Sequence, residues 1–287
     1  MDNIKDIIEK AISKTEKEDV KILLKEALYA EIDGEIRYKL IDMVKSDQWP
    51  EAVPNYLICL DTEEDKTDRA EGILEYIETP IANKKFLDFG CGEGHVALKA
   101  SKDANKSVGY DIEKTGNLNW EQEGNCLLTT KLENLKTHAP YDIILLYDVL
   151  DHCKDPEEVL NQVKNLCDEK TEVYIRFHGF MSRHGTHLYK QINKAWAHIY
   201  LNEKEIEHMG LKETYARKVY FPIKEQEELI FKCGFKKTKE KIVHCNVENY
   251  FQNPYLKKIQ PKCYDSNSAP VWQMSQTFND YIIKLSG

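Results

Sequence analysis

The stretch Leu87-Asp88-Phe89-Gly90-Cys91-Gly92-Glu93-Gly94 decides the expected fold. It contains the end of an apolar run over residues 86–89 and precedes a helical pattern over residues 96–102. Glycines at such a strand-to-helix turn let the backbone approach a ligand closely, and the first turn of the helix offers free N–H groups. The stretch therefore predicts a ligand site at the end of the first strand of an α/β domain.

Short apolar runs alternate with helical stretches beyond this turn. Strands are predicted at residues 86–89, 107–110, 125–129, 141–146, 172–177, 238–244 and 281–285. Helices are predicted at residues 96–102 and 224–232, and from the cap sequence Asp155-Pro156-Glu157-Glu158 onward. Strands that alternate with helices indicate βαβ units, in which a mainly parallel sheet carries helices on both faces. Two long stretches, at about 179–221 and 246–279, interrupt the alternation and are interpreted as substrate-loop insertions.

Residues 1–80 differ from the rest of the chain in pattern and in charge. Four stretches of this segment place apolar residues at helical spacing, which predicts helices that each have an apolar stripe to bury. The segment carries 21 acidic and 11 basic side chains, whereas residues 81–287 carry 28 and 29. We therefore expect an acidic helical cap or oligomerisation segment at residues 1–80, which would allow a homo-oligomer, and a nearly neutral main domain at residues 81–287.

The composition limits the class of protein. The chain of 287 residues has no run of 18 apolar residues that could cross a membrane, and its first six residues lack the features of a secretory signal. Its eight cysteines show no C-x-x-C spacing, which argues against a disulfide framework or a zinc ribbon. We expect a cytoplasmic protein with reduced thiols and no membrane partner.

The glycine turn does not fit the nicotinamide dinucleotide pattern G-x-G-x-x-G, because position 95 is His and the third glycine comes one residue early. The spacing D-x-G-x-G-x-G instead resembles the first motif of the class I methyltransferases that use S-adenosylmethionine. The strand Val108-Gly109-Tyr110-Asp111-Ile112 ends in an acid, as in that family, where the carboxylate binds the ribose hydroxyls of the cofactor. The resemblance implies a Rossmann-like, doubly wound and mostly parallel sheet of seven strands.

Two further segments support this resemblance. The segment Asp148-Val149-Leu150-Asp151-His152 is similar to the family's fourth-strand motif D-V-L-E-H, and residues 226–235 are similar to its last helix. The third loop departs from the family, because Lys131-Leu132 stands where an Asp and a small apolar residue are common. The resemblance implies that S-adenosylmethionine, released as S-adenosylhomocysteine, is bound by Asp88, Phe89, Gly90, Gly92, Gly94, Asp111, Ile112, Leu132, Tyr147 and Asp148.

Residues 176–201 contain no Asp or Glu, although acidic residues are frequent elsewhere in the chain. This acid-free stretch is basic and rich in aromatic residues, and it begins where the fifth strand ends, at the edge where open α/β sheets bind ligands. It predicts a small anionic acceptor that carries phosphate or carboxylate, such as a sugar or a nucleotide sugar. The expected acceptor-binding residues are Arg176, His178, Arg183 and Tyr189. The helical spacing over residues 191–201 favours a core role for Trp196 and Ile199 instead.

A hydroxyl or amine acceptor needs a base, and histidine is suited to that role near neutral pH. His184 and His187 are the candidates for catalysis, although a carboxylate acceptor would need neither. The histidines at 178, 184 and 187 match no metal-ligand spacing, so no metal is expected. A nucleic-acid methyltransferase is disfavoured because residues 81–287 are nearly neutral. A non-catalytic cofactor-binding protein of the same fold stays open as an alternative.

Overall fold

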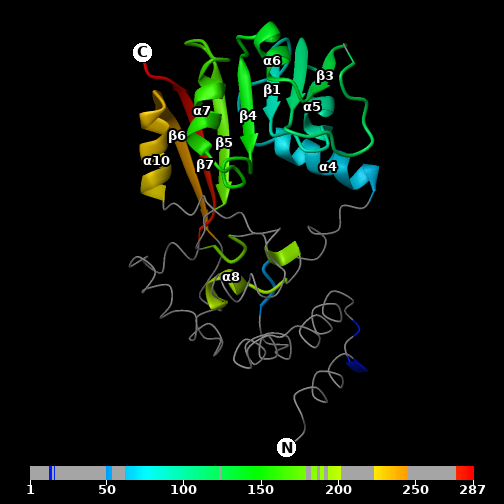
Figure 1. Ribbon diagram of the computed structural model, residues 1–287, viewed down its shortest axis with the longest axis vertical. Coiled ribbons are helices and arrows are strands. Elements are labelled where there is room, and N and C mark those ends of the chain that lie inside the picture. The colour runs from blue at the N-terminus through cyan, green and yellow to red at the C-terminus, as the bar shows by residue number, and fades with distance from the viewer. Residues whose placement is uncertain are drawn as a thin grey trace, which may run out of the picture. The chain divides into compact units, whose positions relative to one another are not determined.

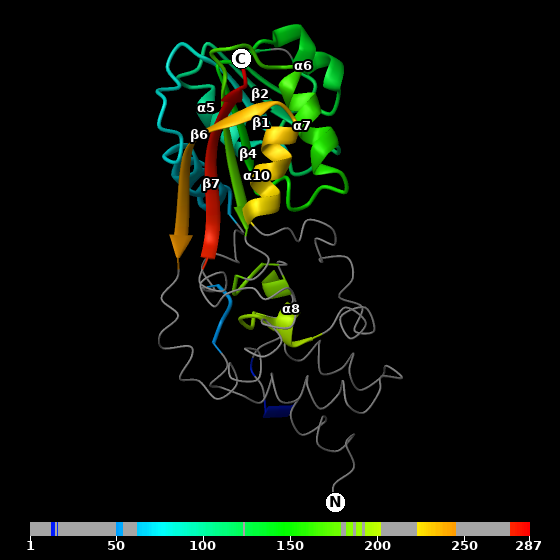
Figure 2. The same ribbon diagram turned by 90° about the vertical axis from the view of Figure 1, so that its left-hand side faces the viewer.

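The structure is a computed structural model that describes residues 13–14, 16, 50–53, 62–122, 124–178, 182–185, 188–190, 193–201, 223–244 and 276–287. The chain divides into two compact units (Figures 1 and 2). One, the sheet unit, comprises Cys59–His178, Arg217–Val243 and Phe278–Gly287. The other, the insertion unit, comprises Met1–Ile58, Gly179–Ala216 and His244–Thr277.

A seven-stranded sheet with the order β3-β2-β1-β4-β5-β7-β6 forms the sheet unit. Its strands, in chain order, are β1 (Lys85–Phe89), β2 (Lys106–Tyr110), β3 (Cys126–Thr129), β4 (Ile143–Tyr147), β5 (Glu172–His178), β6 (Phe235–His244) and β7 (Gln276–Leu285). The five neighbouring strands β3, β2, β1, β4 and β5 pair in parallel, and β7 pairs with β5 in the antiparallel direction. The strand order reverses between β1 and β4, which confirms the expected doubly wound and mostly parallel sheet.

Helices cover both faces of this sheet because successive residues of the buried strands point to opposite sides. On one face Ile144 packs in a core with the helices α6 (Leu132–His138), α7 (Pro156–Lys164) and α10 (Ile223–Lys232). On the other face Ile143 packs in a core with α4 (Glu63–Leu74) and α5 (His95–Ala100). Figure 2 shows α7 and α10 together on one side of the sheet. The helix cap expected at Asp155 is confirmed, since its side chain accepts a hydrogen bond from the Glu158 N–H.

The helix expected over residues 191–201 is shorter than its apolar spacing suggests. Within the described residues 193–201 the structure has only α8 (Ala197–Tyr200), because Trp196 adopts a φ of +56°, a left-handed conformation that a right-handed helix cannot include. Trp196 is nevertheless 1% exposed, so its expected core role is confirmed. The apolar spacing therefore reflects buried residues on both sides of a turn at Trp196, not one face of a continuous helix.

Most of the expected N-terminal helices and of the two expected insertions lie outside the described residues. Helix α4 is described, and it packs on the sheet through the buried Ile73, while Ile77 is buried just beyond its end. The division at residue 80 and the role of residues 1–80 as a cap or an oligomer contact stay predictions. None of the helices in the described part of the chain is long and apolar enough to cross a membrane.

Candidate cofactor and acceptor site

The turn between β1 and α5 adopts a backbone that only glycine tolerates well. The φ angles of Gly90, Gly92 and Gly94 are +82°, +54° and +92°. A Cβ on Gly90 would lie 2.5 Å from Val149 Cγ2, and one on Gly94 would lie 2.6 Å from Leu128 Cδ1, whereas a Cβ on Gly92 would have no atom within 4 Å. Two glycines are therefore required by packing, and the third leaves an open side where a ligand can approach.

Asp111 fixes this turn to the end of β2. Its Oδ2 accepts a hydrogen bond from the Gly92 N–H at 2.7 Å, and its Oδ1 accepts one from the Ile112 N–H at 2.8 Å. The Gly90 N–H also donates to the carbonyl of Tyr110 at 2.7 Å. The side chain of Ile112, beside the carboxylate, is 83% exposed. The arrangement offers a carboxylate for hydroxyl groups and an apolar surface for a flat ring next to the glycine turn.

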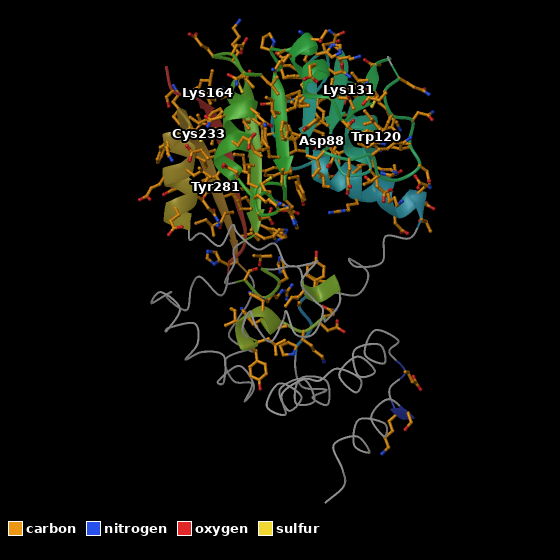
Figure 3. All side chains as sticks on the ribbon, viewed as in Figure 1. Asp88, Trp120, Lys131, Lys164, Cys233 and Tyr281 are labelled. Atoms are coloured by element: carbon orange, nitrogen blue, oxygen red, sulfur yellow. The ribbon has the colours of Figure 1, made fainter. Side chains whose placement is uncertain are left out.

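Asp88 is a buried acid beneath the same turn. It is 3% exposed within the sheet (Figure 3), and its Oδ2 has no hydrogen-bond partner among the described residues. Burial, with a smaller contribution from the charge of Asp111, raises the pKa of Asp88 to about 7. A cationic ligand group would satisfy this carboxylate. Phe89, by contrast, places its side chain in the hydrophobic core, with its ring 4.9 Å from that of Tyr110.

The third loop receives a carboxylate that the local sequence does not supply. Lys131 is exposed at the start of α6 (Figure 3), and Leu132 is half-buried against the core. Glu121, from the segment before β3, accepts hydrogen bonds from the Thr130 N–H and the Thr129 hydroxyl, both at 2.9 Å. No motif in the sequence identified Glu121. Its position beside the third loop depends on its backbone φ of +59° and on the hydrogen bond from its N–H to β3.

Arg176, at the end of β5, is held by a carboxylate and three rings. Its Nε and Nη2 donate to the two oxygens of Asp280, both at 2.7 Å, and its Nη1 donates to the hydroxyl of Tyr147 at 2.7 Å. Its guanidinium carbon lies 4.8 Å from the ring centres of Tyr76 and Tyr147 and 4.5 Å from that of Phe278. The charge of Asp280 offsets that of Arg176. This pairing favours a role for Arg176 in fixing the geometry of the site, instead of the binding of an anionic acceptor that the sequence predicted.

Asp148 and His178 form an ion pair beside this arginine. Asp148 follows β4 with a φ of +57°, and its N–H donates to the carbonyl of Arg176 at 3.2 Å. Its Oδ1 lies 2.9 Å from His178 Nε2, and the imidazole packs edge-on against Phe278. Burial alone would lower the pKa of His178, but the charge and hydrogen bond of Asp148 raise it above its ordinary value. The structure thus brings together one residue expected to bind the cofactor and one expected to bind the acceptor.

The other acceptor and base candidates belong to the insertion unit. His184 is buried, and its ring lies 6.1 Å from that of Tyr189 in an edge-on contact. The carbonyl of Arg183 accepts a hydrogen bond from the Trp196 N–H at 2.8 Å, which fixes the backbone next to His184. His187 lies outside the described residues. Within this unit the structure brings His184 and Tyr189 together, whereas Arg176 and His178 belong to the sheet unit.

The chain is similar in sequence to known methyltransferases. A family model described as a methyltransferase domain matches residues 62–236. The ubiquinone biosynthesis O-methyltransferase of Hydrogenovibrio crunogenus is 29% identical over 98 residues, which cover 31% of this chain and 41% of that protein. The tRNA U34 carboxymethyltransferase of Haemophilus ducreyi is 28% identical over 152 residues, which cover 48% and 47%. The chain therefore spans less than half the length of either curated relative.

Among solved structures, a SAM-dependent methyltransferase from Archaeoglobus fulgidus aligns with 16% identity and a TM-score of 0.46, covering 80% of this chain and all of that one. The match to the methyltransferase family model covers more than half of the chain. The glycine turn, the acid at the end of β2 and the seven-stranded sheet agree with that match. The chain belongs to the class I methyltransferases, whose cofactor is S-adenosylmethionine.

Proposed function

We propose that the protein transfers the methyl group of S-adenosylmethionine to an oxygen or nitrogen of a small anionic acceptor. The hydrogen bond from the Gly92 N–H to Asp111 carries the cofactor part of this proposal, because it sets the carboxylate and the open turn side by side. The acid-free residues 176–201 carry the acceptor part. Because Asp280 offsets the charge of Arg176, the later basic residues of the stretch, among them Arg183, are the ones that favour phosphate or carboxylate on the acceptor.

The cofactor would lie along the ends of β1, β2 and β4. Asp88 would accept from the ammonium group of its methionine part, and Asp111 would accept from the ribose hydroxyls. Ile112 and Leu132 would contact the adenine ring, and Tyr147 would lie near the methionine chain. These roles fit the burial of Asp88 and the exposure of Ile112.

When bound, the cofactor would supply a methyl group activated by a sulfonium sulfur, and the acceptor would have to lie in line with the carbon–sulfur bond so that the new bond forms as that bond breaks. The acceptor oxygen or nitrogen forms the new bond to the methyl carbon, and a base takes its proton. We assign the base to His184 or His187, and acceptor contacts to Arg183 and Tyr189. Positioning can supply about 7–11 kcal/mol of the barrier reduction, so a base is a secondary contribution.

The two curated relatives differ in the acceptors that their names state, one in ubiquinone biosynthesis and the other on tRNA. Near-neutral charge over residues 81–287 favours the small molecule over a polyanion. A cytoplasmic location and an oligomer formed through residues 1–80 are further proposals. The five described cysteines are free thiols, which is consistent with the proposed cytoplasmic location.

The test is transfer of a labelled methyl group from S-adenosylmethionine to components of a cell extract, separated into small-molecule, RNA and protein fractions. We expect label in the small-molecule fraction, at an anionic compound retained by an anion exchanger. Label confined to the RNA fraction and released by ribonuclease would replace the small acceptor with a nucleic acid. An absence of transfer to every fraction, with the cofactor still bound, would favour the non-catalytic alternative.

The base assignment has a separate test in single-turnover transfer at saturating acceptor. His184→Ala or His187→Ala should slow the transfer by about 10²–10⁴-fold if that histidine takes the proton. Wild-type rates in both variants would remove both histidines from this role.

A further inference from the structure

Tyr147, the last residue of β4, carries a hydroxyl whose proton no described residue accepts. Its oxygen accepts a hydrogen bond from Arg176 Nη1 at 2.7 Å. Its half-buried ring meets that of Tyr76 edge-on, with the ring centres 6.2 Å apart. A tyrosine hydroxyl can accept and donate at the same time, and a partly buried one is normally satisfied in both ways. The donor side of this hydroxyl is therefore available to a ligand at the end of β4.

The arginine that binds this hydroxyl is fixed from the far side. Asp280 of β7 stands opposite Arg176 of β5 and accepts from its Nε and Nη2, both at 2.7 Å. Two parallel hydrogen bonds fix the plane of a guanidinium, which leaves Nη1 aimed at the tyrosine. Because hydrogen bonds in a chain polarise one another, a hydroxyl that accepts from a cation is a stronger donor. Burial raises the pKa of Tyr147 above its ordinary value, so the hydroxyl keeps its proton near neutral pH.

The sheet places this donor close to Asp88, on the same face. In the parallel pair of β1 and β4, Asp88 stands opposite Leu145, and Tyr147 is two residues further along β4. Alternate residues share a face, and Phe86, Leu145 and Tyr147 all pack in the core beneath α4 and α5. From about 3.3 Å per residue and about 4.8 Å between strands, the Cα atoms of Asp88 and Tyr147 are roughly 8 Å apart. A group bound between them would contact both side chains.

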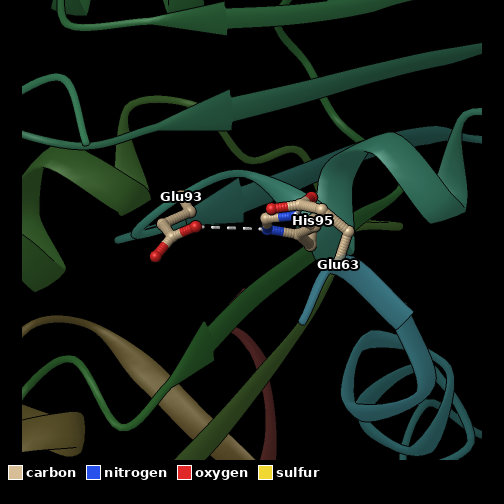
Figure 4. A group of neighbouring side chains, drawn as sticks. All are labelled: Glu63, Glu93 and His95. Carbon is tan, nitrogen blue, oxygen red and sulfur yellow. Dashed lines mark hydrogen bonds and ion pairs between the residues drawn. The ribbon is translucent and has the colours of Figure 1, made fainter. Parts of the chain in front are cut away.

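Helix α4 connects this part of the sheet to the glycine turn. At the start of the helix, Glu63 Oε2 lies 2.8 Å from His95 Nε2, and Lys66 Nζ lies 2.6 Å from Glu93 Oε2 (Figure 4). Glu93 belongs to the glycine turn, and His95 directly follows it. Just beyond the other end of the helix, Tyr76 packs against the tyrosine at the end of β4. One element thus contacts both places between which the methionine part of the cofactor is proposed to lie.

We propose that Arg176 and Asp280 position the Tyr147 hydroxyl to donate a hydrogen bond to the carboxylate of the cofactor's methionine part. This inference rests on the proposed placing of the cofactor, in which Asp88 accepts from the ammonium group. The ammonium and the carboxylate are carried by the same carbon atom, so a donor for the carboxylate has to lie close to Asp88. Arg176 and Asp280 are positioning residues here, because they act through the hydroxyl.

The experiment measures calorimetric binding of S-adenosylhomocysteine and of its decarboxylated analogue, which keeps the ammonium group and lacks only the carboxylate. Tyr147→Phe should weaken binding of S-adenosylhomocysteine at least about tenfold, as expected for a lost hydrogen bond to a charged group, and leave binding of the analogue unchanged. Tyr174→Phe is the matched control. It removes a hydroxyl from the same face of the sheet that bonds to Thr79 and Glu172, and it should bind both ligands as the wild type does.

Arg176→Lys tests the positioning role. Lysine keeps the charge but lacks the planar fork that reaches Asp280 and Tyr147 together. The substitution should weaken binding of S-adenosylhomocysteine in the wild type and have little further effect in Tyr147→Phe, because residues that act through one another are not additive. Circular dichroism identifies the folded variants, and either single variant provides the test if the other fails to fold.

The proposal is overturned if a folded Tyr147→Phe binds S-adenosylhomocysteine as tightly as the wild type, or if a folded variant loses affinity for both ligands equally. Fully additive effects of the two substitutions would remove the positioning role of Arg176. Asp111→Ala, measured alongside, separates this failure from that of the cofactor placing. Weaker binding in Asp111→Ala with wild-type affinity in Tyr147→Phe overturns this inference alone, whereas wild-type affinity in both overturns the placing as well.

Discussion

Replacing Asp88 with asparagine should change how stability depends on pH. Asp88 is 3% exposed, and its pKa is raised from 3.8 to about 7, mainly by burial. Between these two values the unfolded chain has lost the Asp88 proton while the folded protein retains it, so folding stability falls as pH rises. At about 1.4 kcal/mol for each pH unit, the full loss reaches at most about 4 kcal/mol above pH 7.

The assay is urea unfolding at pH 5, 6, 7 and 8 for the wild type and for Asp88→Asn, followed by circular dichroism. The difference in free energy of unfolding should shift in favour of the variant as the pH rises, because asparagine does not ionise. Asp68→Asn, which removes a charge from the exposed face of α4, controls for the loss of one negative charge. Parallel pH profiles for wild type and Asp88→Asn would refute the reasoning that Asp88 is protonated in the folded protein at low pH and charged above pH 7.

Two further predictions concern the packing of the glycine turn and the ion pair of Arg176. Gly94→Ala should destabilise the protein by about 1–3 kcal/mol more than Gly92→Ala, because only the first places a Cβ against Leu128, and denaturant unfolding of both variants checks the difference. Equal losses would contradict the packing argument. Asp280→Ala should cost about 3–5 kcal/mol in free energy of unfolding, since it leaves the guanidinium of Arg176, whose side chain is only 14% exposed, without its carboxylate. A loss below about 1 kcal/mol would show that this pair is screened as surface pairs are.

The sheet was predictable because its strands are short apolar runs that follow one another in βαβ units. The glycine turn and Asp111 were also predictable, since both lie within local motifs that place them at the ends of β1 and β2. The apolar spacing over residues 191–201 predicted a longer helix than α8, because the spacing continues across the left-handed Trp196. Spacing alone does not reveal a single residue with positive φ.

The environment of Arg176 could not be predicted from the acid-free stretch. Its partner Asp280 is 104 residues away in the sequence and reaches it only because β7 pairs with β5 in the antiparallel direction. The same long-range pairing places Phe278 beside His178. Charge counted along the chain indicated a free cation, whereas the three-dimensional pairing offsets that cation with a carboxylate.

Calorimetric titration with S-adenosylmethionine tests the central claim, that the glycine turn and Asp111 hold this cofactor. The account predicts one saturable site in the wild type. Hydrogen bonds to a charged group contribute about 1.5–3 kcal/mol each, so loss of the ribose contacts in Asp111→Ala should weaken binding at least about tenfold, while Asp68→Ala leaves it unchanged. Equal affinity in a folded Asp111→Ala, or no binding by the wild type, would contradict the account.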